Sequence, residues 1–284
     1  MNKTKDLSII NCISTTLLAY FFTIPVHELF HLLTDYAYGD KVTWFSAGAV
    51  QPMGSIDYMS LSPFHRIMVT GGSASILNVI IGLILMFIVL KVPMGPLMRL
   101  FLVQFTGTQL TTGIGYFMIG GFFAVGDWGL VFSHLSDRPG LVTAIRIALS
   151  VTGSLGIVGL FFLLNYMSYY FIEDKDNRKE RLSVAFKLHL LVLLIGYTVG
   201  IIVTLLSPAM GSGELSLGLG LLYNMMWISF FWGFMFTGPM HTLPPKKSRF
   251  LYRLPAKPNW VLFSVSVVLI LIDIFVFGPG IRIN

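Results

Sequence analysis

Two histidines and a glutamate within five consecutive residues form the most chemically suggestive group in this chain. His27, Glu28 and His31 occur as His-Glu-x-x-His. On an α-helix the two histidines lie one turn apart on the same face, where two imidazoles can hold one zinc ion. Glu28 would lie beside that ion and could take a proton from a zinc-bound water. The motif therefore predicts a hydrolytic metal centre holding one zinc ion per chain, because zinc is the default ion for such ligands.

A third protein ligand is needed, because a catalytic zinc site uses three protein ligands and keeps one position open. We predict Asp127, which lies in the sequence Gly-Asp-Trp-Gly, where the glycines permit a break in a helix. Asp35 lies four residues after His31 on the same helix face, which suits an outer partner of a histidine better than a ligand. The alternatives left open are other histidines and carboxylates: His65, Asp57, Asp35 and His134.

The composition places this group in a membrane protein. The chain is 55% hydrophobic and 11% charged, with a mean hydropathy of +0.78, which excludes an ordinary soluble domain. The first apolar stretch is too long, and too charged at the motif, for a cleavable signal peptide. We expect an all-α polytopic membrane protein with about seven transmembrane helices, over residues 8–36, 63–90, 97–123, 140–172, 184–206, 217–238 and 260–279.

The net charge of +6 follows the predicted topology. Lys and Arg gather in alternate loops, near residues 3–5, 91–99, 175–181 and 246–257, which predicts a cytoplasmic N-terminus and an outside C-terminus. These basic loops fit contact with the lipid bilayer of the cytoplasmic membrane, and nucleic acid is not an expected partner. A single cysteine, Cys12, excludes an intrachain disulfide and a cysteine-based zinc cluster.

The segment after the first span is not a transmembrane helix. Residues 37–62 contain Gly39, Gly48, Pro52 and Gly54 between short β-prone runs, which predicts a hairpin or re-entrant loop. An exposed strand edge there can pair with an extended substrate, and a plain surface loop is the alternative. Pro25 is expected to bend the first helix, either opening space at the metal or forming a tolerated kink.

The second and third spans carry polar residues. Asn78 lies in the second span, where it can hold a substrate carbonyl, orient a ligand or form an interhelical hydrogen bond. The third span is polar in its middle and therefore faces a wet groove or packs tightly. The first and third spans run in the same direction, so His31 and Asp127 are expected on the same side of the bilayer, the outer side.

These motifs together resemble the site-2 protease class of intramembrane zinc metalloproteases, peptidase family M50. His27, Glu28 and His31 match the family's first motif, Asn78 matches the asparagine of Gly-Pro-x-x-Asn, and Asp127 matches the aspartate of Leu-Asp-Gly. Different residues flank Asn78 and Asp127 here. The resemblance covers roughly residues 15–135 and implies that His27, His31 and Asp127 bind zinc, that Glu28 is catalytic and that Asn78 binds substrate.

The sequence therefore predicts a metalloprotease core at residues 1–135, followed by C-terminal transmembrane helices at 136–284. The expected activity is zinc-dependent hydrolysis of transmembrane segments or hydrophobic peptides, and a membrane protein partner is possible for the C-terminal helices. The alternative is a transporter or peptide-export component with a structural metal site. An inactive relative that retains membrane proteins is a third hypothesis, against which the intact Glu28 argues.

Overall fold

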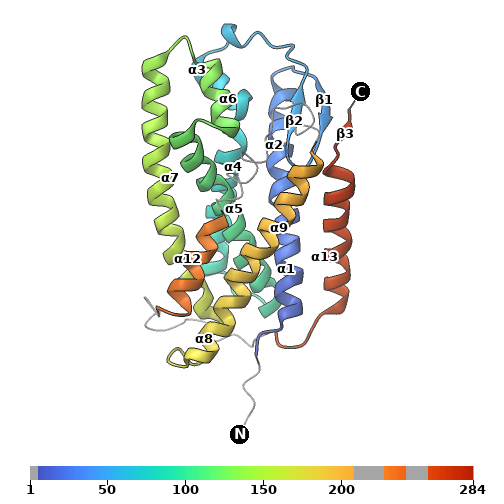
Figure 1. Ribbon diagram of the computed structural model, residues 1–284, viewed down its shortest axis with the longest axis vertical. Helices are drawn as coiled ribbons and strands as arrows, with labels where there is room; N and C mark the ends of the chain where they lie inside the picture. The colour runs from blue at the N-terminus through green and yellow to red at the C-terminus, as the bar shows by residue number, and fades with distance from the viewer. Residues whose placement is uncertain (1–5, 208–226, 241–254, 284) are drawn as a thin grey trace.

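Apolar helices dominate the computed structural model, which describes residues 6–207, 227–240 and 255–283. Most run along the long axis of the molecule (Figure 1). The helices are α1 Ile9–Phe21, α2 Ile24–Ala37, α3 Pro63–Ile67, α4 Ser73–Lys91, α5 Pro96–Phe123, α6 Gly126–His134, α7 Pro139–Ser168, α8 Arg178–Ala185, α9 Leu191–Leu206, α12 Ile228–Thr237 and α13 Trp260–Ile272. The strands are β1 Val42–Phe45, β2 Val50–Pro52 and β3 Ile281–Arg282.

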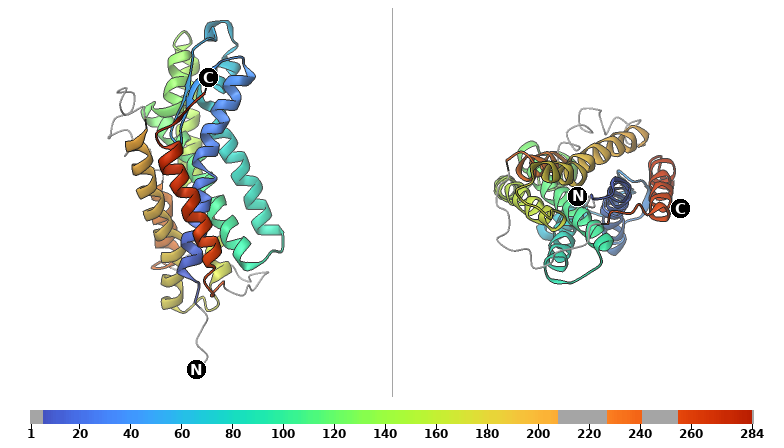
Figure 2. Two further views of the ribbon diagram at one scale, coloured as in Figure 1. Left: turned by 90° about the vertical axis from the view of Figure 1, so that its right-hand side faces the viewer. Right: turned by 90° about the horizontal axis from the view of Figure 1, so that it is seen from below.

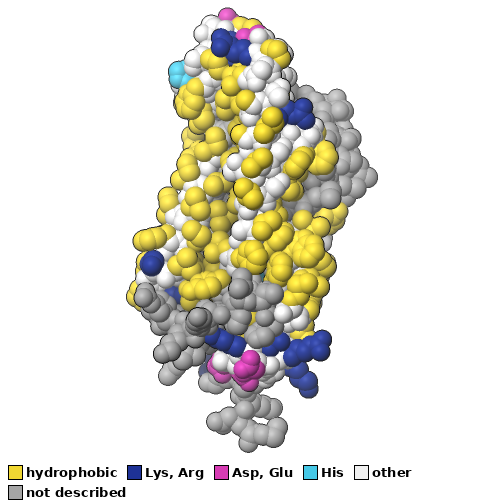
Figure 3. All heavy atoms as spheres, turned by 90° about the vertical axis from the view of Figure 1, so that its left-hand side faces the viewer, with side chains coloured by type: hydrophobic (Ala, Val, Ile, Leu, Met, Phe, Trp, Pro, Cys, Tyr) yellow, Lys and Arg dark blue, Asp and Glu magenta, His cyan; other side chains and the backbone are white. Residues whose placement is uncertain are grey.

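Five helical stretches among the described residues are long and apolar enough to cross a membrane: Ile9–Ala37, Pro63–Lys91, Pro139–Phe171, Arg178–Leu206 and Trp260–Phe277. A sixth results if α5 and α6 are counted as one bent span. The predicted span at 217–238 lies partly outside the described residues, and its described part, α12, has 10 residues. Apolar side chains cover the flank of the molecule, and charged ones gather toward its two ends (Figure 3). These features indicate a multi-pass membrane protein.

The first predicted span forms two helices where the sequence suggested one bent helix. α1 ends at Phe21 and α2 begins at Ile24, so the break lies just before Pro25. Pro25 occupies the first turn of α2, where its missing N–H has no helical partner to lose. The Thr23 hydroxyl in the break donates to the Ala19 carbonyl at 2.7 Å and pairs with the Thr108 hydroxyl at 2.9 Å. The break therefore starts a new helix immediately before His27.

A three-stranded sheet caps the end of the bundle where α2 ends (Figure 1). β1 pairs antiparallel with β2 on one side and with β3 on the other, so the order is β2-β1-β3. The buried Asp40 carboxylate accepts bonds from the backbone N–H groups of Lys41 and Ser55, at 2.9 and 3.0 Å, and so fixes the chain on both sides of the sheet. The all-α expectation did not include β3, which comes from the far end of the sequence. The sheet leaves β2 as a strand with an unpaired edge.

α5 is the central helix of the bundle. It packs along α4, α7 and α1, while α1 lies between α5 and α13 (Figure 2). The polar side chains in the middle of α5 are buried, which selects tight packing over a wet groove: Gln104, Thr106, Thr108, Gln109, Thr111 and Thr112. The main hydrophobic cluster contains residues from both sides of position 135, including Leu110 of α5 and Leu164 of α7. The functional division at residue 135 stays a prediction.

Candidate metal centre

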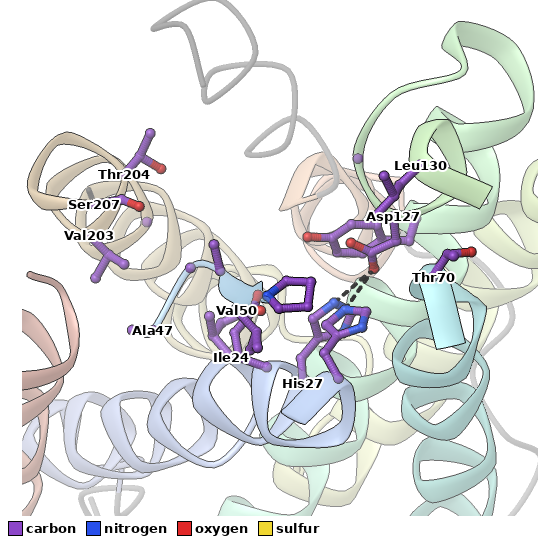
Figure 4. Close-up of a pocket in the computed structure, with 18 of the residues that line it drawn as sticks. Ile24, His27, Ala47, Val50, Thr70, Asp127, Leu130, Val203, Thr204 and Ser207 are labelled. Atoms are coloured by element: carbon purple, nitrogen blue, oxygen red, sulfur yellow. Dashed lines mark hydrogen bonds and ion pairs between the residues drawn. The ribbon is translucent and has the colours of Figure 1, made fainter. Parts of the chain in front are cut away.

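Three predicted ligands from two distant segments of the sequence meet at one point. Asp127 Oδ2 lies 3.1 Å from His27 Nε2 and 3.3 Å from His31 Nε2. One donor atom from each residue lies within 4.8 Å of the other two, and this is the one such group among the described residues. Figure 4 shows the two imidazoles of α2 and the carboxylate of α6 directed at one another. The His-Glu-x-x-His helix and the residue after the third predicted span therefore form one cluster.

The donor set and its spacing fit a zinc ion. Two imidazole nitrogens and a carboxylate oxygen are a common catalytic zinc set, with bonds of about 2.0–2.1 Å. Ligand atoms at the corners of a tetrahedron with such bonds lie about 3.3 Å apart. The distances from Asp127 to the two histidines, 3.1 and 3.3 Å, match that spacing. Three acceptor-capable atoms at this separation repel one another unless a cation or protons lie between them.

α2 presents both histidines to the same cavity as Glu28. The cavity has a volume of about 300 Å³ and is lined by His27, Glu28 and His31. Glu28 is buried, at 5% exposed, and directly follows His27 on α2. The opposite wall comes from the sheet and from the end of α9: Val50, Pro52, Val203, Thr204 and Ser207 (Figure 4). A substrate in this cavity would lie between the metal ligands and the edge strand β2.

His27 is held on two sides. Its Nδ1 is hydrogen-bonded to the side-chain oxygen of Asn78 in α4. Its ring stacks on Tyr116 of α5, with centroids 4.7 Å apart and planes 20° apart. A hydrogen bond to one ring nitrogen of a histidine fixes which nitrogen is available to a metal. These contacts leave Nε2 of His27 directed at Asp127.

Asp127 reaches the histidines because α6 packs closely on the π-helical turn Met68–Gly72, which directly precedes α4. α5 ends at Ala124 in the left-handed conformation, with φ of 52°, and α6 follows at an angle of 52°. The Trp128 indole then donates to the Ser75 hydroxyl at 3.1 Å. Gly71 faces the Asp127 backbone so closely that an added Cβ would lie 2.6 Å from the Asp127 carbonyl oxygen. The approach of Asp127 thus depends on a glycine in a neighbouring helix.

Replacing Gly71 by Ala is expected to weaken zinc binding by roughly 10-fold or more. Gly71 has φ of 156°, a conformation that residues with side chains rarely adopt, so alanine is strained there. The new methyl group also overlaps the Asp127 backbone, so α6 must move away and misplace the carboxylate. Zinc affinity of the purified protein, measured by competition with a fluorescent chelator, checks this. The matched control is Gly54→Ala, where φ is also positive, at 68°, and an added Cβ meets nothing within 4 Å. Equal affinity in the two variants would contradict the packing argument.

The alternative third ligands are not part of the cluster. The ring of His65 packs on Tyr38 at 5.5 Å, and the ring of His134 packs on Tyr58 at 4.2 Å. Asp57 accepts a bond from the Met59 N–H at the start of a short helical turn. Asp35 lines the cavity, but its carboxylate does not belong to the three-ligand group. Among the described residues, Asp127 is therefore the third ligand that the geometry favours.

Asn78 lies next to the predicted ligand His27. Its side chain is fully buried, and it is not among the residues that line the cavity. Its amide joins His27 to Gln109 of α5. This position fits the alternative in which Asn78 orients a ligand, and its contact with a substrate stays a prediction.

The sequence reasoning missed three residues around the centre. Tyr116 and Gln109 are seven residues apart on one face of α5, a spacing that could have marked that face as the one toward His27. Tyr58 lines the cavity from the loop after β2, and no local pattern marks it. Burial and the nearby Asp40 carboxylate raise the pKa of the Tyr58 hydroxyl to about 12, so it stays neutral at neutral pH.

Comparison with known proteins adds no relative. No protein-family model, curated protein or solved structure matches this chain.

Proposed function

We propose that this chain is a zinc-dependent intramembrane endopeptidase of the site-2 protease type. The observation that carries the proposal is one cavity in which Glu28 lies beside the cluster of His27, His31 and Asp127. A structural metal site does not require a free carboxylate next to its ligands, whereas hydrolysis requires a base there. The substrates would be transmembrane segments or hydrophobic peptides, because the cavity lies among membrane-spanning helices.

The residues of the cavity divide the chemistry among them. His27, His31 and Asp127 would hold the zinc ion, which when bound supplies a Lewis acid for activating water and polarising a carbonyl. Glu28 takes the proton from the attacking water and passes it to the nitrogen of the leaving amine. Asn78 and Tyr116 hold the His27 ring in place throughout.

The edge of β2 is the proposed docking site for the substrate backbone. A helical segment hides its peptide bonds in its own hydrogen bonds, so it must be extended before cleavage. β2 is an edge strand, and Val50 and Pro52 line the cavity opposite the ligands. An extended substrate pairing with this edge would pass in front of the metal ligands. The short loop between β1 and β2 adds Gly48 and Ala49 to the same wall.

We further propose seven spans, with the N-terminus in the cytoplasm and the cavity toward the outer side of the cytoplasmic membrane. Support comes from the distribution of Lys and Arg along the molecular axis. Among the described residues, the end where α1 begins carries the larger group: Lys91, Arg99, Lys175, Arg178, Lys179, Arg181, Lys187 and Lys257. The half toward the other end carries the smaller group: Lys41, Arg66, Arg138, Arg146 and Arg282. The cavity lies nearer the second end.

Removal of zinc tests the proposal. We expect the full chain, reconstituted in liposomes, to cleave members of a pool of synthetic single-span peptides that contain Gly, Pro or Asn in their outer halves. Stripping the metal with a chelator should lower cleavage at least about 100-fold, and about one equivalent of zinc should restore it. Mass spectrometry of the peptides reports the cut sites. Cleavage that survives complete metal removal, or a folded protein that takes up no metal, would overturn the proposal.

A further inference from the structure

The metal ligand His27 begins a chain of buried hydrogen bonds that runs across three helices. His27 Nδ1 contacts the side-chain oxygen of Asn78, the Asn78 amide nitrogen contacts the side-chain oxygen of Gln109, and the Gln109 amide nitrogen contacts the carbonyl oxygen of Phe22 at 3.3 Å. Asn78 and Gln109 are both fully buried. The chain thus begins on α2, passes through α4 and α5, and returns to the break between α1 and α2.

The direction of every bond in this chain follows from its last member. A backbone carbonyl such as that of Phe22 can only accept, so Gln109 must turn its NH₂ group toward it. The Gln109 oxygen is then left to accept from the Asn78 NH₂ group. Asn78 must consequently present its own oxygen to His27, and His27 must carry its proton on Nδ1. Nε2 of His27 is then the nitrogen with a free lone pair.

We infer that Gln109 is a positioning residue that fixes the ring orientation of His27 through Asn78, and thereby readies Nε2 for the metal. This inference rests on the metal site of the proposed function. Without Gln109, the Asn78 amide can flip and present its NH₂ group to His27. Nδ1 of His27 would then accept, and the ring proton would lie on Nε2, the nitrogen that faces the metal site. Outer contacts of this kind typically change metal affinity by 10–100-fold.

The break between α1 and α2 supplies the backbone carbonyl at which the hydrogen-bond chain ends. Phe22 lies outside both helices, so its carbonyl oxygen is available to a side chain. Thr23 adds a second bond from the break to α5, through Thr108. The break therefore ties the start of the metal-binding helix to α5 at the point where Gln109 acts.

The test is the zinc affinity of Gln109→Met, measured on the full detergent-purified chain by competition with a fluorescent chelator. Met is close to Gln in size but can form neither of the two hydrogen bonds of the Gln109 amide group. We expect affinity 10–100-fold below that of the wild type. The matched control is Gln104→Met, on the same helix, where the buried Gln104 amide also bonds to an α1 carbonyl, that of Cys12, at 3.4 Å. Its zinc affinity should be unchanged, although its thermal stability should fall.

The same substitution in an Asn78→Asp protein distinguishes an effect on the orientation of His27 from an effect on the packing of α5. In Asn78→Asp, either carboxylate oxygen accepts the Nδ1–H of His27, and the Gln109 oxygen loses its donor. Gln109 therefore no longer decides which His27 nitrogen carries the proton. Gln109→Met should therefore change zinc affinity by less than about twofold in that background. An unchanged affinity of Gln109→Met in the Asn78 protein, or an equal loss in both backgrounds, would overturn the inference. A folded wild-type protein that binds no zinc would instead contradict the proposed function itself.

A measurement on the wild type covers the case in which the variants do not fold. Nitrogen NMR of the zinc-loaded, ¹⁵N-histidine-labelled wild type distinguishes the two ring nitrogens of each zinc-bound histidine. No variant is needed for the assignment, because His27 and His31 both direct Nε2 at Asp127. We expect the proton on Nδ1 and zinc on Nε2. Zinc on Nδ1 is incompatible with the hydrogen-bond chain and would overturn the inference.

Discussion

Replacing Glu28 by Gln is expected to lower the rate of peptide cleavage by roughly a thousandfold while the protein keeps its zinc. Glutamine has nearly the same shape as glutamate but cannot take up a proton, and general base catalysis is typically responsible for 10²–10⁴ in rate. Glu28 lines the cavity but lies outside the three-ligand group, so the metal should remain bound. The measurement is cleavage of the peptide pool by reconstituted protein, with zinc content determined on the same samples.

The control for this variant is Glu180→Gln, the same change of acid to amide at the opposite end of the molecule. Glu180 accepts bonds from the backbone N–H groups of Glu173 and Asp174 and does not touch the cavity. It should cleave at the wild-type rate. If Glu28→Gln retains both its zinc and the full biological function of the chain, the metal site is structural and a transport or export role becomes the better account. A folded, inactive variant would also retain bound substrates for identification.

Removal of Asp127 is expected to abolish stoichiometric zinc binding. Asp127 supplies the one carboxylate of the cluster, and its oxygen is the atom that both histidines approach. Loss of a direct ligand should weaken binding by more than the 10–100-fold that is typical of outer contacts. Metal analysis by mass spectrometry should find about one zinc per wild-type chain and almost none in Asp127→Ala or His31→Ala.

The matched variants for this experiment are the other residues that the sequence offered as third ligands. His65→Ala and His134→Ala should retain the full zinc content, because both side chains pack on tyrosines outside the cluster. Asp57→Ala should retain it as well, since Asp57 only caps a short turn. Zinc that persists in Asp127→Ala but disappears in one of these variants would show that the ligand set is wrong.

Local sequence patterns were enough to predict the helix that carries His27 and His31 and the apolar helices that are long enough to span a membrane. His27 and His31 share a face because of helical periodicity alone, and long apolar stretches must cross the bilayer as helices because lipid offers no partners for backbone groups. The proximity of Asp127 to His27 and His31 also followed from the order of the spans. The first and third spans cross the membrane in the same direction, so their C-terminal ends lie on the same side. Five or six spans are present among the described residues, and the predicted span at 217–238 lies partly outside them.

Contacts between distant segments decided the rest. An amide in an apolar helix needs a hydrogen-bond partner, but the sequence does not tell which partner Asn78 has. Only the packing of α4 against α2 and α5 shows that His27 and Gln109 are its partners. The close approach of Asp127 depends on Gly71, which lies more than fifty residues earlier, and no local pattern links the two. β3 joins β1 across almost the whole chain. Such pairings depend on shape complementarity between folded elements. The periodicity of hydrophobic residues along a sequence carries no information about that complementarity.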